Sequence, residues 1–350
     1  MPEGHSVHRI ARQFSTNFVG RRVHASSPQG RFADGAALID GRTMTDARAI
    51  GKHLFLQFDG SRFLHVHLGM YGAWDFAGEI TTDPTIRSAG GRMGQTNQRG
   101  TFLDPAAPIT DDAPDESAPA GFGDRAPGLM NVEDSVASMG APRRARLRMA
   151  ESESVLEDAL EQWPPEPVGQ VRVRLLTDTA VADLRGATEC EILGPGQVQQ
   201  VLERLGPDPL VDRPKEGERR FIARASKTSR PIALVLMDQE VIAGIGNVYR
   251  AELLFRARLN PFTPANQLPT EVLAALWRDW SKLLRIGVET GQMMTMDRLG
   301  PKRWAKAMAS RDDRHWVYHR AGLPCRRCGT PIQVQEIATR KLYWCPVCQA

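Results

Sequence analysis

The 350-residue sequence predicts a multidomain α+β protein with an N-terminal β-sandwich and its flanking helix, a helical domain and a C-terminal zinc β-hairpin. Three observations support this prediction. Short segments with two-residue alternation dominate from about residue 20 to residue 193, helical periodicity follows from Gly196, and two Cys-x2-Cys pairs occupy the last 26 residues. The length is sufficient for two or three domains, each with its own core.

The N-terminal domain is expected over residues 2–195. Residues 4–18 place their apolar side chains at helical spacing on one face, at Val7, Ile10, Phe14 and Phe18. Alternating apolar residues then predict short strands at 22–26, 44–50, 53–58, 62–68, 171–176, 179–184 and 189–193. Many short strands of this kind favour a sandwich or a barrel.

A segment of different composition, residues 82–166, interrupts these strands. It is rich in Pro, Gly, Ala, Ser and Asp and shows no period, which predicts a disordered acidic insertion. Residues 101–170 carry 5 basic and 14 acidic side chains, whereas the other 280 residues carry 40 basic and 27 acidic ones. A basic folded body favours a polyanionic partner, although an unevenly charged surface that is merely solvated has the same composition.

Helical patterns predict a second domain over residues 196–292. Its first helices are expected at 198–205 and 216–225, and Pro231 favours the first turn of a third. The glycine-rich stretch 243–247 precedes another helix, which ends near Arg256. A long helix at about 270–290 would bury Val272, Leu276, Trp280, Leu283 and Leu284.

The last domain, residues 312–350, is predicted to be a four-cysteine zinc finger with the ligands Cys325, Cys328, Cys345 and Cys348. The two knuckles are 16 residues apart, and the segment between them alternates as a hairpin does. Four thiolates leave no open position on the metal, so one zinc ion per chain would be structural. Two disulfides are the alternative, which the odd fifth cysteine, Cys190, and the absence of a secretion signal disfavour.

The compartment is expected to be the cytoplasm. No run of 18 apolar residues is present, so no membrane contact is expected, and the N-terminal Met-Pro-Glu-Gly-His does not resemble a secretion signal. A reducing cytosol agrees with a free thiol and a zinc site.

The N-terminus offers a nucleophile. Removal of Met1 would expose the secondary amine of Pro2, and an α-amino group titrates near 8, so part of it is neutral at pH 7. Such an amine can attack a sugar C1′ carbon and form an iminium ion, with Glu3 beside it to donate or accept protons. Taken alone, these three residues are more often just an efficiently processed N-terminus.

Five motifs change that interpretation. Met-Pro-Glu-Gly at 1–4, Gly-Lys-His-Leu at 51–54, His-Leu-Gly-Met-Tyr-Gly at 67–72, Ala-Gly-Ile-Gly-Asn-Val-Tyr-Arg at 243–250 and the four-cysteine ribbon follow one another in this order. The chain therefore resembles the formamidopyrimidine-DNA glycosylase/endonuclease VIII family of base-excision repair enzymes. The resemblance covers essentially everything except the insertion, and it implies that residues 231–256 form the family's helix–two-turn–helix motif.

The resemblance also implies a role for each matching residue. Pro2 is the expected nucleophile, Glu3 the acid that protonates the ribose ring oxygen, and Lys52 a proton donor and phosphate or base contact. Asn247, at a helix start where free N–H groups favour an anion, and Arg340 are expected to hold phosphates of the DNA. Each has a plainer alternative: a solvated turn residue for Lys52, an ordinary cap for Asn247 and a surface side chain for Arg340.

Three residues near the end of the fourth predicted strand complete the expected site. His67 matches a further phosphate contact, although a histidine at a strand end is often structural. Met70 and Tyr71 are candidates for the wedge that fills the gap left by a flipped base, and a loop that covers the core is the alternative.

Two departures bear on the substrate. The family often has a second glutamate soon after Glu3, where this chain has His5-Ser6, and the 8-oxoguanine branch has an Arg-x-Phe wedge where this chain has 183–186, Asp-Leu-Arg-Gly. Together with Tyr71 and the Tyr-Trp-Cys ending of the ribbon, these departures favour the endonuclease VIII branch and oxidised pyrimidines.

The expected function is a bifunctional DNA glycosylase and AP lyase that cleaves by β,δ-elimination through a Pro2 Schiff base. Its partner would be damaged double-stranded DNA in the bacterial nucleoid, and it would act as a monomer without a small-molecule cofactor. Two alternatives stay open: a non-catalytic DNA-binding paralogue that senses damage, and a zinc-ribbon scaffold for other proteins. The scaffold predicts weak, salt-insensitive DNA binding.

Overall fold

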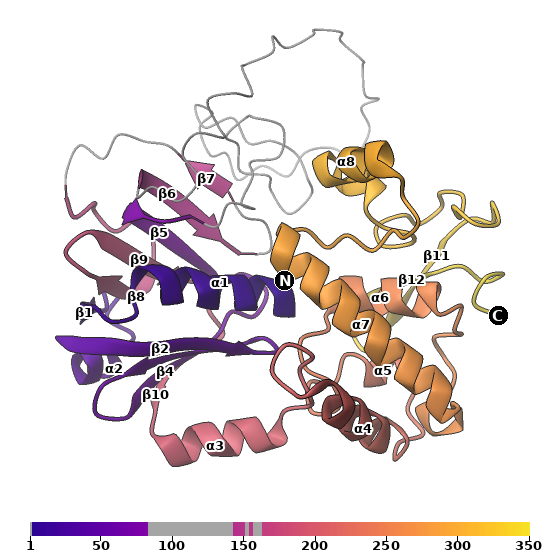
Figure 1. Cartoon of the computed structure of the whole chain (residues 1–350), viewed down its shortest axis with the longest axis horizontal. Coiled ribbons are helices and arrows are strands. Elements are labelled where there is room, and N and C mark those ends of the chain that lie inside the picture. The colour runs from indigo at the N-terminus through magenta and orange to yellow at the C-terminus, as the bar shows by residue number, and fades with distance from the viewer. Residues whose placement is uncertain (1, 83–142, 151–153, 157–162) are drawn as a thin grey trace, which may run out of the picture.

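The computed structural model describes residues 2–82, 143–150, 154–156 and 163–350. It shows a β-rich N-terminal part and a helical part side by side, with the C-terminal hairpin against the helices (Figure 1). The predicted insertion at 82–166 lies largely outside the described residues. None of the described helices combines the length and the apolar character that a membrane crossing needs.

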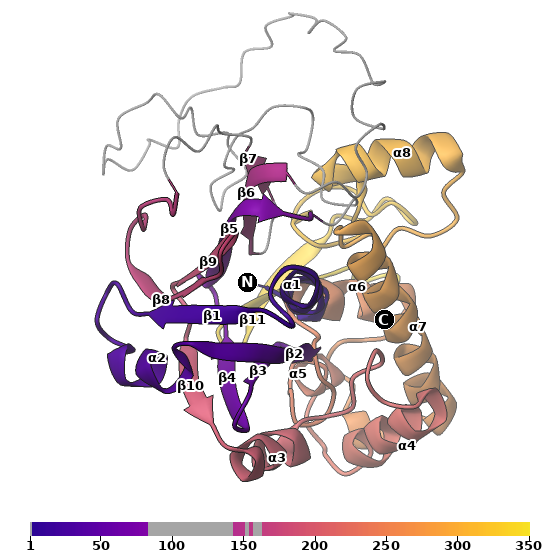
Figure 2. The ribbon, with the colours of Figure 1, turned by 60° about the vertical axis from the view of Figure 1, so that its left-hand side comes forward.

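The strands form one continuous ten-stranded sheet in the order β10-β4-β3-β2-β1-β8-β9-β5-β6-β7, and every neighbouring pair is antiparallel. It folds into two layers around β1, as Figures 1 and 2 show. The strand bounds are β1 Arg22–Ser26, β2 Arg42–Ile50, β3 His53–Phe58, β4 Arg62–His67, β5 Ala73–Ile80, β6 Arg143–Met149, β7 Ser154–Leu156, β8 Val171–Leu176, β9 Ala180–Arg185 and β10 Glu189–Leu193. A short helix, α2 (Ala33–Ile39), follows β1 and was not predicted.

Helix α1 (Gly4–Asn17) joins the two layers to the helical part. The apolar face predicted from its spacing is buried, and the Phe14 ring lies 4.7 Å from that of Trp74 and 4.9 Å from that of Phe76. Truncation of such a side chain costs about 3–5 kcal/mol. On its other side, buried Arg9 donates to the carbonyl oxygen of Val288 at 2.7 Å. The helix therefore fixes the N-terminus at the boundary between the two parts.

One expectation needs correction. Residues 143–149 and 154–156 belong to the predicted disordered insertion, but they form β6 and β7. Strand β6 pairs with β5 from Ile80↔Arg143 to Trp74↔Met149, and β7 pairs with β6 from Arg146↔Leu156 to Arg148↔Ser154. Leu147 and Met149 are buried with half-exposed Arg148 between them, so the two-residue alternation is present. The arginines of this strand and the acidic residues near it obscured the alternation. Its pairing with β5 joins segments far apart in the sequence, so no local pattern predicts it.

The helical part packs around one apolar core that includes Tyr249, Trp277 and Trp280. Its helices are α4 Pro214–Ala225, α5 Ile232–Val235, α6 Asn247–Arg256 and α7 Thr270–Thr290, with a 3-10 turn η2 at Ala265–Gln267. The preceding helix, α3 Pro195–Arg204, packs through Val198 against Phe55, Phe63 and Leu193 of the β-rich part. Between this part and the hairpin lie α8 Pro301–Ala309 and the 3-10 turn η3 Arg311–Asp313, which the sequence interpretation had left without structure.

The C-terminal hairpin pairs β11 (Gln333–Ile337) with β12 (Arg340–Trp344) and ends in a two-residue turn. Both turn residues, Ala338 and Thr339, have positive φ angles, 47° and 62°. A turn with two left-handed residues follows the twist of the strands, and it is unusual here because neither residue is glycine. Since β12 packs on α6, the hairpin belongs to the helical part.

Candidate active site

Three glycines bring distant segments into backbone contact: Gly4 at the start of α1, Gly51 in the β2–β3 turn and Gly244 before α6. The Gly4 N–H donates to the Gly244 carbonyl oxygen at 2.8 Å. A Cβ atom on Gly4 would lie 2.9 Å from the Cα atom of Gly244, and one on Gly51 would lie 2.8 Å from the Cβ atom of Ala243. Only small residues allow this approach, which makes the residues next to these glycines neighbours.

Glu3, the N-cap residue of α1, is buried in this junction with 2% of its surface exposed. Its carboxylate accepts hydrogen bonds from the backbone N–H groups of Gly246 and Val248, both at 2.8 Å, and of Tyr249 at 3.4 Å. It therefore sits at the N-terminus of α6, where unpaired N–H groups and the helix dipole favour a negative charge. The carboxyl group is held rigidly, because its donors are backbone groups.

Two opposing effects act on the pKa of Glu3. Burial raises the pKa above its usual value, and this outweighs the lowering by Lys52 and by the three backbone donors. A raised pKa increases the share of the carboxyl group that carries a proton at a given pH, and a protonated carboxyl group can deliver its proton to a substrate atom. This is the property that the sequence-based role of Glu3 requires.

Lys52 and Pro2 are buried beside Glu3. Burial is the main cause that lowers the pKa of Lys52 to about 8; nearby Arg340 lowers it further, and Glu3 opposes the shift. A lysine with this pKa exchanges its proton readily at neutral pH. Lys52 therefore interacts electrostatically with both Glu3 and Arg340. Pro2 immediately precedes Glu3 and is buried as well.

A residue that the sequence interpretation missed, Asp208, holds the turn that carries Lys52. It is fully buried and accepts hydrogen bonds from the Gly51 N–H at 2.6 Å and, through the same oxygen, from His8 Nε2 at 2.8 Å. Its other carboxylate oxygen accepts from the Leu210 N–H at 2.8 Å. Asp208 lies between two prolines in the sequence, which predicts a turn and gives no sign of a contact with residue 51.

Asn247 begins α6 and joins it to the hairpin. Its Nδ2 group donates to the Lys341 carbonyl oxygen at 2.8 Å, and its Oδ1 atom accepts from Arg250. Arg250, also missed, is fully buried, and its Nη2 group donates to the same Lys341 oxygen at 3.1 Å. Among the described residues, Nε and Nη1 of Arg250 have no hydrogen-bond partner. The predicted phosphate contact Asn247 is thus adjacent to a buried guanidinium group.

The loop after β4 meets the tip of the hairpin. Met70 and Tyr71 are 50% and 64% exposed, among the largest exposed apolar side chains of the described residues. Arg340, the first residue of β12, approaches Met70, with 3.8 Å between Nη1 and Sδ. The alternative of a loop that covers the core does not fit this exposure. The two wedge candidates and the predicted arginine therefore share one edge.

His67 ends β4 close to the same junction. It is partly buried, its ring centroid lies 5.0 Å from that of His53, and burial lowers its pKa, with Lys52 and His65 acting in the same direction. It belongs to a group of three histidines on β3 and β4 and is less accessible than Met70 or Tyr71.

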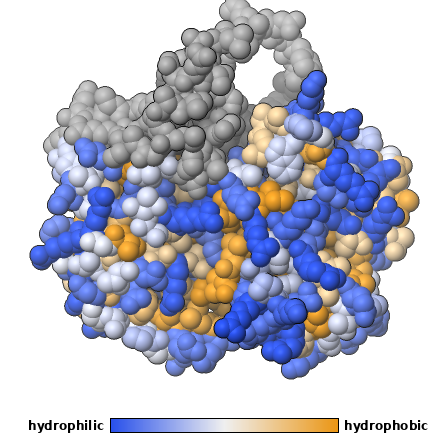
Figure 3. All heavy atoms as spheres, in the orientation of Figure 1, coloured by the Kyte–Doolittle hydropathy of each residue, from blue (hydrophilic) through white to orange (hydrophobic). Residues whose placement is uncertain are grey.

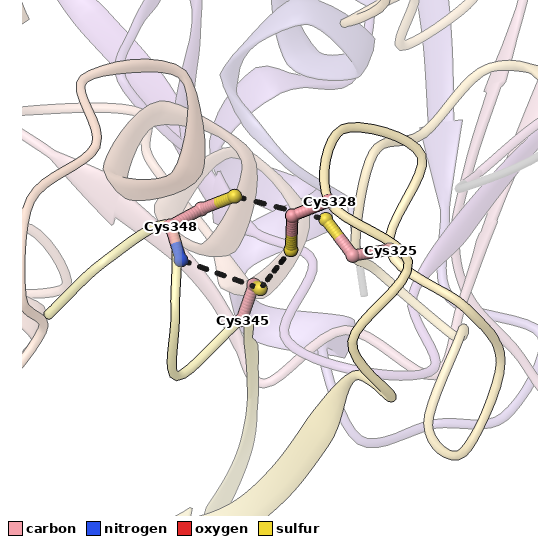
Figure 4. A group of neighbouring side chains, drawn as sticks. All are labelled: Cys325, Cys328, Cys345 and Cys348. Carbon is pink, nitrogen blue, oxygen red and sulfur yellow. Dashed lines mark hydrogen bonds between the residues drawn. The ribbon is translucent and has the colours of Figure 1, made fainter.

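The four cysteines gather at the base of the hairpin (Figure 4). All four sulfur atoms lie within 4.8 Å of one another, with 3.9 Å between Cys325 and Cys348 and 3.5 Å between Cys328 and Cys345. Ligands of a tetrahedral zinc with Zn–S bonds of about 2.3 Å lie about 3.8 Å apart, so the set fits the ion. The four cysteines hold one structural zinc.

The distribution of hydrophilic and apolar residues on the surface follows the division between the β-rich and helical parts. On the face seen in Figure 1, hydrophilic residues cover most of both parts, and apolar residues gather in a strip near their boundary (Figure 3). The buried junction of Glu3 and Lys52 lies at this boundary.

Comparisons with known protein families cover most of the chain. Residues 1–105 match the formamidopyrimidine-DNA glycosylase N-terminal domain, residues 205–298 match the formamidopyrimidine-DNA glycosylase H2TH domain, and residues 322–350 match the zinc finger found in FPG and IleRS. The H2TH match contains the expected helix–two-turn–helix segment.

Individual relatives extend over the whole chain. Endonuclease 8 1 of Mycobacterium tuberculosis is 36% identical over 349 residues, which cover 100% of both chains. The formamidopyrimidine-DNA glycosylase of Thermus thermophilus is 38% identical over 149 residues, 43% of this chain and 55% of that protein.

Solved structures show the same fold. The MutM (Fpg) protein from Thermus thermophilus aligns with a TM-score of 0.60 at 22% identity and covers 99% of this chain and 98% of its own. The Lactococcus lactis Fpg in complex with DNA containing an abasic site aligns with a TM-score of 0.61 at 18% identity and covers 99% of each chain.

Proposed function

The chain belongs to the formamidopyrimidine-DNA glycosylase/endonuclease VIII family, and we propose that its reaction runs through the N-terminal amine of Pro2 in the junction described above. The protein is a base-excision repair DNA glycosylase with AP-lyase activity. The observation that carries the proposal is the burial of Pro2, Glu3 and Lys52 together at the start of α6.

The first half of the reaction removes the base. After loss of Met1, the neutral Pro2 nitrogen attacks C1′ of the damaged nucleotide and the C1′–N bond to the base breaks. The base leaves with the electron pair of that bond and takes up the proton that the Pro2 nitrogen loses. Glu3 protonates the ribose ring oxygen, the C1′–O4′ bond opens, and a cationic Schiff base forms between Pro2 and C1′. The raised pKa of Glu3 supports this assignment, because the acid must hold a proton before the ring opens.

The second half cleaves the strand. The iminium ion acidifies the C2′ proton; its removal forms a double bond and expels the 3′ phosphate in β-elimination. Loss of a C4′ proton then expels the 5′ phosphate in δ-elimination, and water releases Pro2 from the sugar fragment. Lys52, with its pKa of about 8, is the proposed proton donor in the site. Zinc takes no part in these steps.

DNA would be held at the boundary between the two parts. Asn247, Arg340 and His67 are the proposed phosphate contacts, and Met70 and Tyr71 the proposed wedge. The contact between Arg340 and Met70 supports this, because it brings the hairpin tip to the loop that carries the proposed wedge. Buried Arg250, with two nitrogens unpaired among the described residues, adds positive charge beside Asn247.

The finer parts of the assignment rest on the sequence. We propose oxidised pyrimidines as substrates, because the Arg-x-Phe pattern is absent and Tyr71 is present. The domain division at 2–195, 196–292 and 312–350, action as a monomer without a small-molecule cofactor, and a cytoplasmic location belong to the same proposal.

Borohydride trapping tests the proposed Schiff base on Pro2. The purified protein is incubated with duplexes carrying an abasic site, an oxidised pyrimidine or 8-oxoguanine, and borohydride reduces any Schiff base to a stable adduct. We expect a covalent adduct that peptide mass spectrometry assigns to Pro2, formed faster on the oxidised pyrimidine than on 8-oxoguanine. Salt-sensitive DNA binding without an adduct would instead support the damage-sensing paralogue.

A further inference from the structure

A second group of metal-ligating side chains lies outside the active site, on three neighbouring strands. His53 on β3 and His65 on β4 share a hydrogen bond of 2.8 Å between Nδ1 and Nε2, and Glu189 stands on β10. The potential ligand atoms of these three residues all lie within 4.8 Å of one another. They are separate from the four cysteines, which belong to the hairpin of the helical part.

The sheet register places these residues on one face. His67 of β4 is opposite His53 of β3 and Glu189 of β10, and His65 is opposite Glu191. Since strand side chains alternate between faces, all of them point away from the sandwich core. Cys190, between the two glutamates, has the opposite orientation and packs against the core, so it is not a ligand candidate.

A cavity of about 620 Å³ opens over this face. Its lining comes from both parts of the molecule and includes His53, His65, Glu189, Glu191, Arg204 and Glu240. Arg172 also lines the cavity. The guanidinium groups of Arg172 and Arg204 repel a cation there, and the three carboxylates of Glu189, Glu191 and Glu240 attract it. The cavity has room for an ion together with coordinated water molecules.

We propose that His53, His65 and Glu189 bind a divalent transition-metal cation, with Zn²⁺ as the probe, on the outer face of the β10–β4–β3 layer. Two imidazoles and one carboxylate are a donor set that suits zinc and related ions, with the remaining position left to water. Tetrahedral nitrogen ligands at about 2.0–2.1 Å from zinc lie about 3.3 Å apart, so the two rings need to separate by only about half an ångström.

The surroundings of His65 support the assignment. His65 is buried, and its Nδ1 atom shares a hydrogen bond of 2.9 Å with Oε1 of Glu191. A carboxylate on one ring nitrogen orients the imidazole and directs the other nitrogen to a metal, which is a recurring feature of metal sites. Glu191 is therefore a positioning residue. A bound ion would connect the three strands next to Lys52, because His53 follows it directly.

Zinc stoichiometry in the absence of DNA tests the proposal independently of the glycosylase reaction. The full-length protein is dialysed against buffered free zinc, and bound metal is counted per chain. We expect two zinc ions in the wild type, of which one is lost in the double variant His53→Gln/His65→Gln. One zinc ion per chain at every free concentration below precipitation would overturn the proposal.

Exposed residues provide variants that leave the fold intact. Glu189→Gln and Glu191→Gln are each expected to weaken the second zinc by at least about 10-fold. Glu240→Gln, which removes the same charge from the same cavity but no proposed ligand, should leave its affinity within about 2-fold, because long-range charge effects are screened. Equal losses in all three variants would indicate a diffuse attraction of cations and would contradict a built site.

Cobalt substitution distinguishes the two sites by their ligands. Cobalt bound by four thiolates shows sulfur-to-metal charge-transfer absorption, whereas a second cobalt on two imidazoles and a carboxylate adds only weaker d–d bands. We expect the second equivalent to add no charge-transfer intensity and to be absent in Glu189→Gln. Additional charge-transfer absorption would place the second ion on a cysteine and exclude the histidine site.

Discussion

The two sides of the candidate active site differ in how they are built. Glu3 and Lys52 are 2% and 6% exposed, and their geometry comes from backbone hydrogen bonds and contacts between glycines. Met70 and Tyr71 are 50% and 64% exposed and lie on a loop. Burial shifts the pKa values of the first pair, whereas the second pair is available for contact with another molecule. The chemistry and the recognition of DNA should therefore respond differently to mutation.

The largest effect is expected at Glu3. The change Glu3→Gln keeps the size of the side chain but removes the proton donor, and base excision should fall by about 10²- to 10⁴-fold. Single-turnover excision of an oxidised pyrimidine measures this. The amide nitrogen of the variant would also face a backbone N–H group, so the free energy of unfolding has to be measured alongside. A variant that excises at the wild-type rate would remove Glu3 from the mechanism.

The next effect concerns the pH dependence that Lys52 introduces. Its pKa is lowered from 10.5 to about 8 in the folded protein, so the unfolded chain binds more protons between these values. The free energy of unfolding of the wild type should therefore rise with pH from about 8 to 10.5, by on the order of 3 kcal/mol, relative to Lys52→Met. Denaturant titrations at several pH values test this, and Lys282→Met, an exposed position on α7, is the control.

The same lysine should limit activity at high pH. If Lys52 donates a proton in the site, the excision rate falls as the pH rises through about 8, because the donor is then deprotonated. The rate of Lys52→Met should be low and should lack this decline. A wild-type profile that is flat to pH 10 would show that another group donates the proton.

The substitution Gly246→Ala tests the packing around Glu3 on the buried side of the site. A Cβ atom there would lie 2.4 Å from Cδ of Glu3, so Gly246→Ala must displace the carboxyl group and should destabilise the protein by about 1–3 kcal/mol. Excision should fall as well, while binding to an undamaged duplex should change little. Gly196→Ala on α3, where no atom lies within 4 Å of the added Cβ, is the matched control and is expected to be neutral or slightly stabilising.

The exposed side should show the reverse pattern. Tyr71→Ala is expected to change the free energy of unfolding by less than about 0.5 kcal/mol, because the side chain is mostly in solvent. It should weaken binding to damaged duplexes by about 1–3 kcal/mol if the ring stacks on DNA bases. Val211→Ala, a similarly exposed apolar position on the helical part, is the control. Comparable losses for both variants would show that exposure alone, and not a wedge, explains the effect.

Local patterns in the sequence were sufficient for much of the fold. The apolar spacing of residues 4–18 gave α1, the pattern of residues 270–290 gave α7, and the two cysteine pairs gave the zinc hairpin, because each depends on interactions between near neighbours in the chain. The short helix α2, the helix α8 and the strand β6 were missed. For β6, arginines obscured the alternation, and its pairing with β5 joins segments that are remote in the sequence.

The sequence by itself determined which chemical groups are present: an N-terminal Met-Pro-Glu, a lysine after a glycine, a glycine-rich helix start and four cysteines. The family resemblance gave these residues roles, but spacing could not place residue 3 against residue 246. Only the tertiary structure showed that Glu3 is bound by the α6 backbone, that Asp208 holds the turn of Lys52, and that His53, His65 and Glu189 meet on one face. Contacts between remote segments depend on packing in three dimensions, which no local pattern encodes.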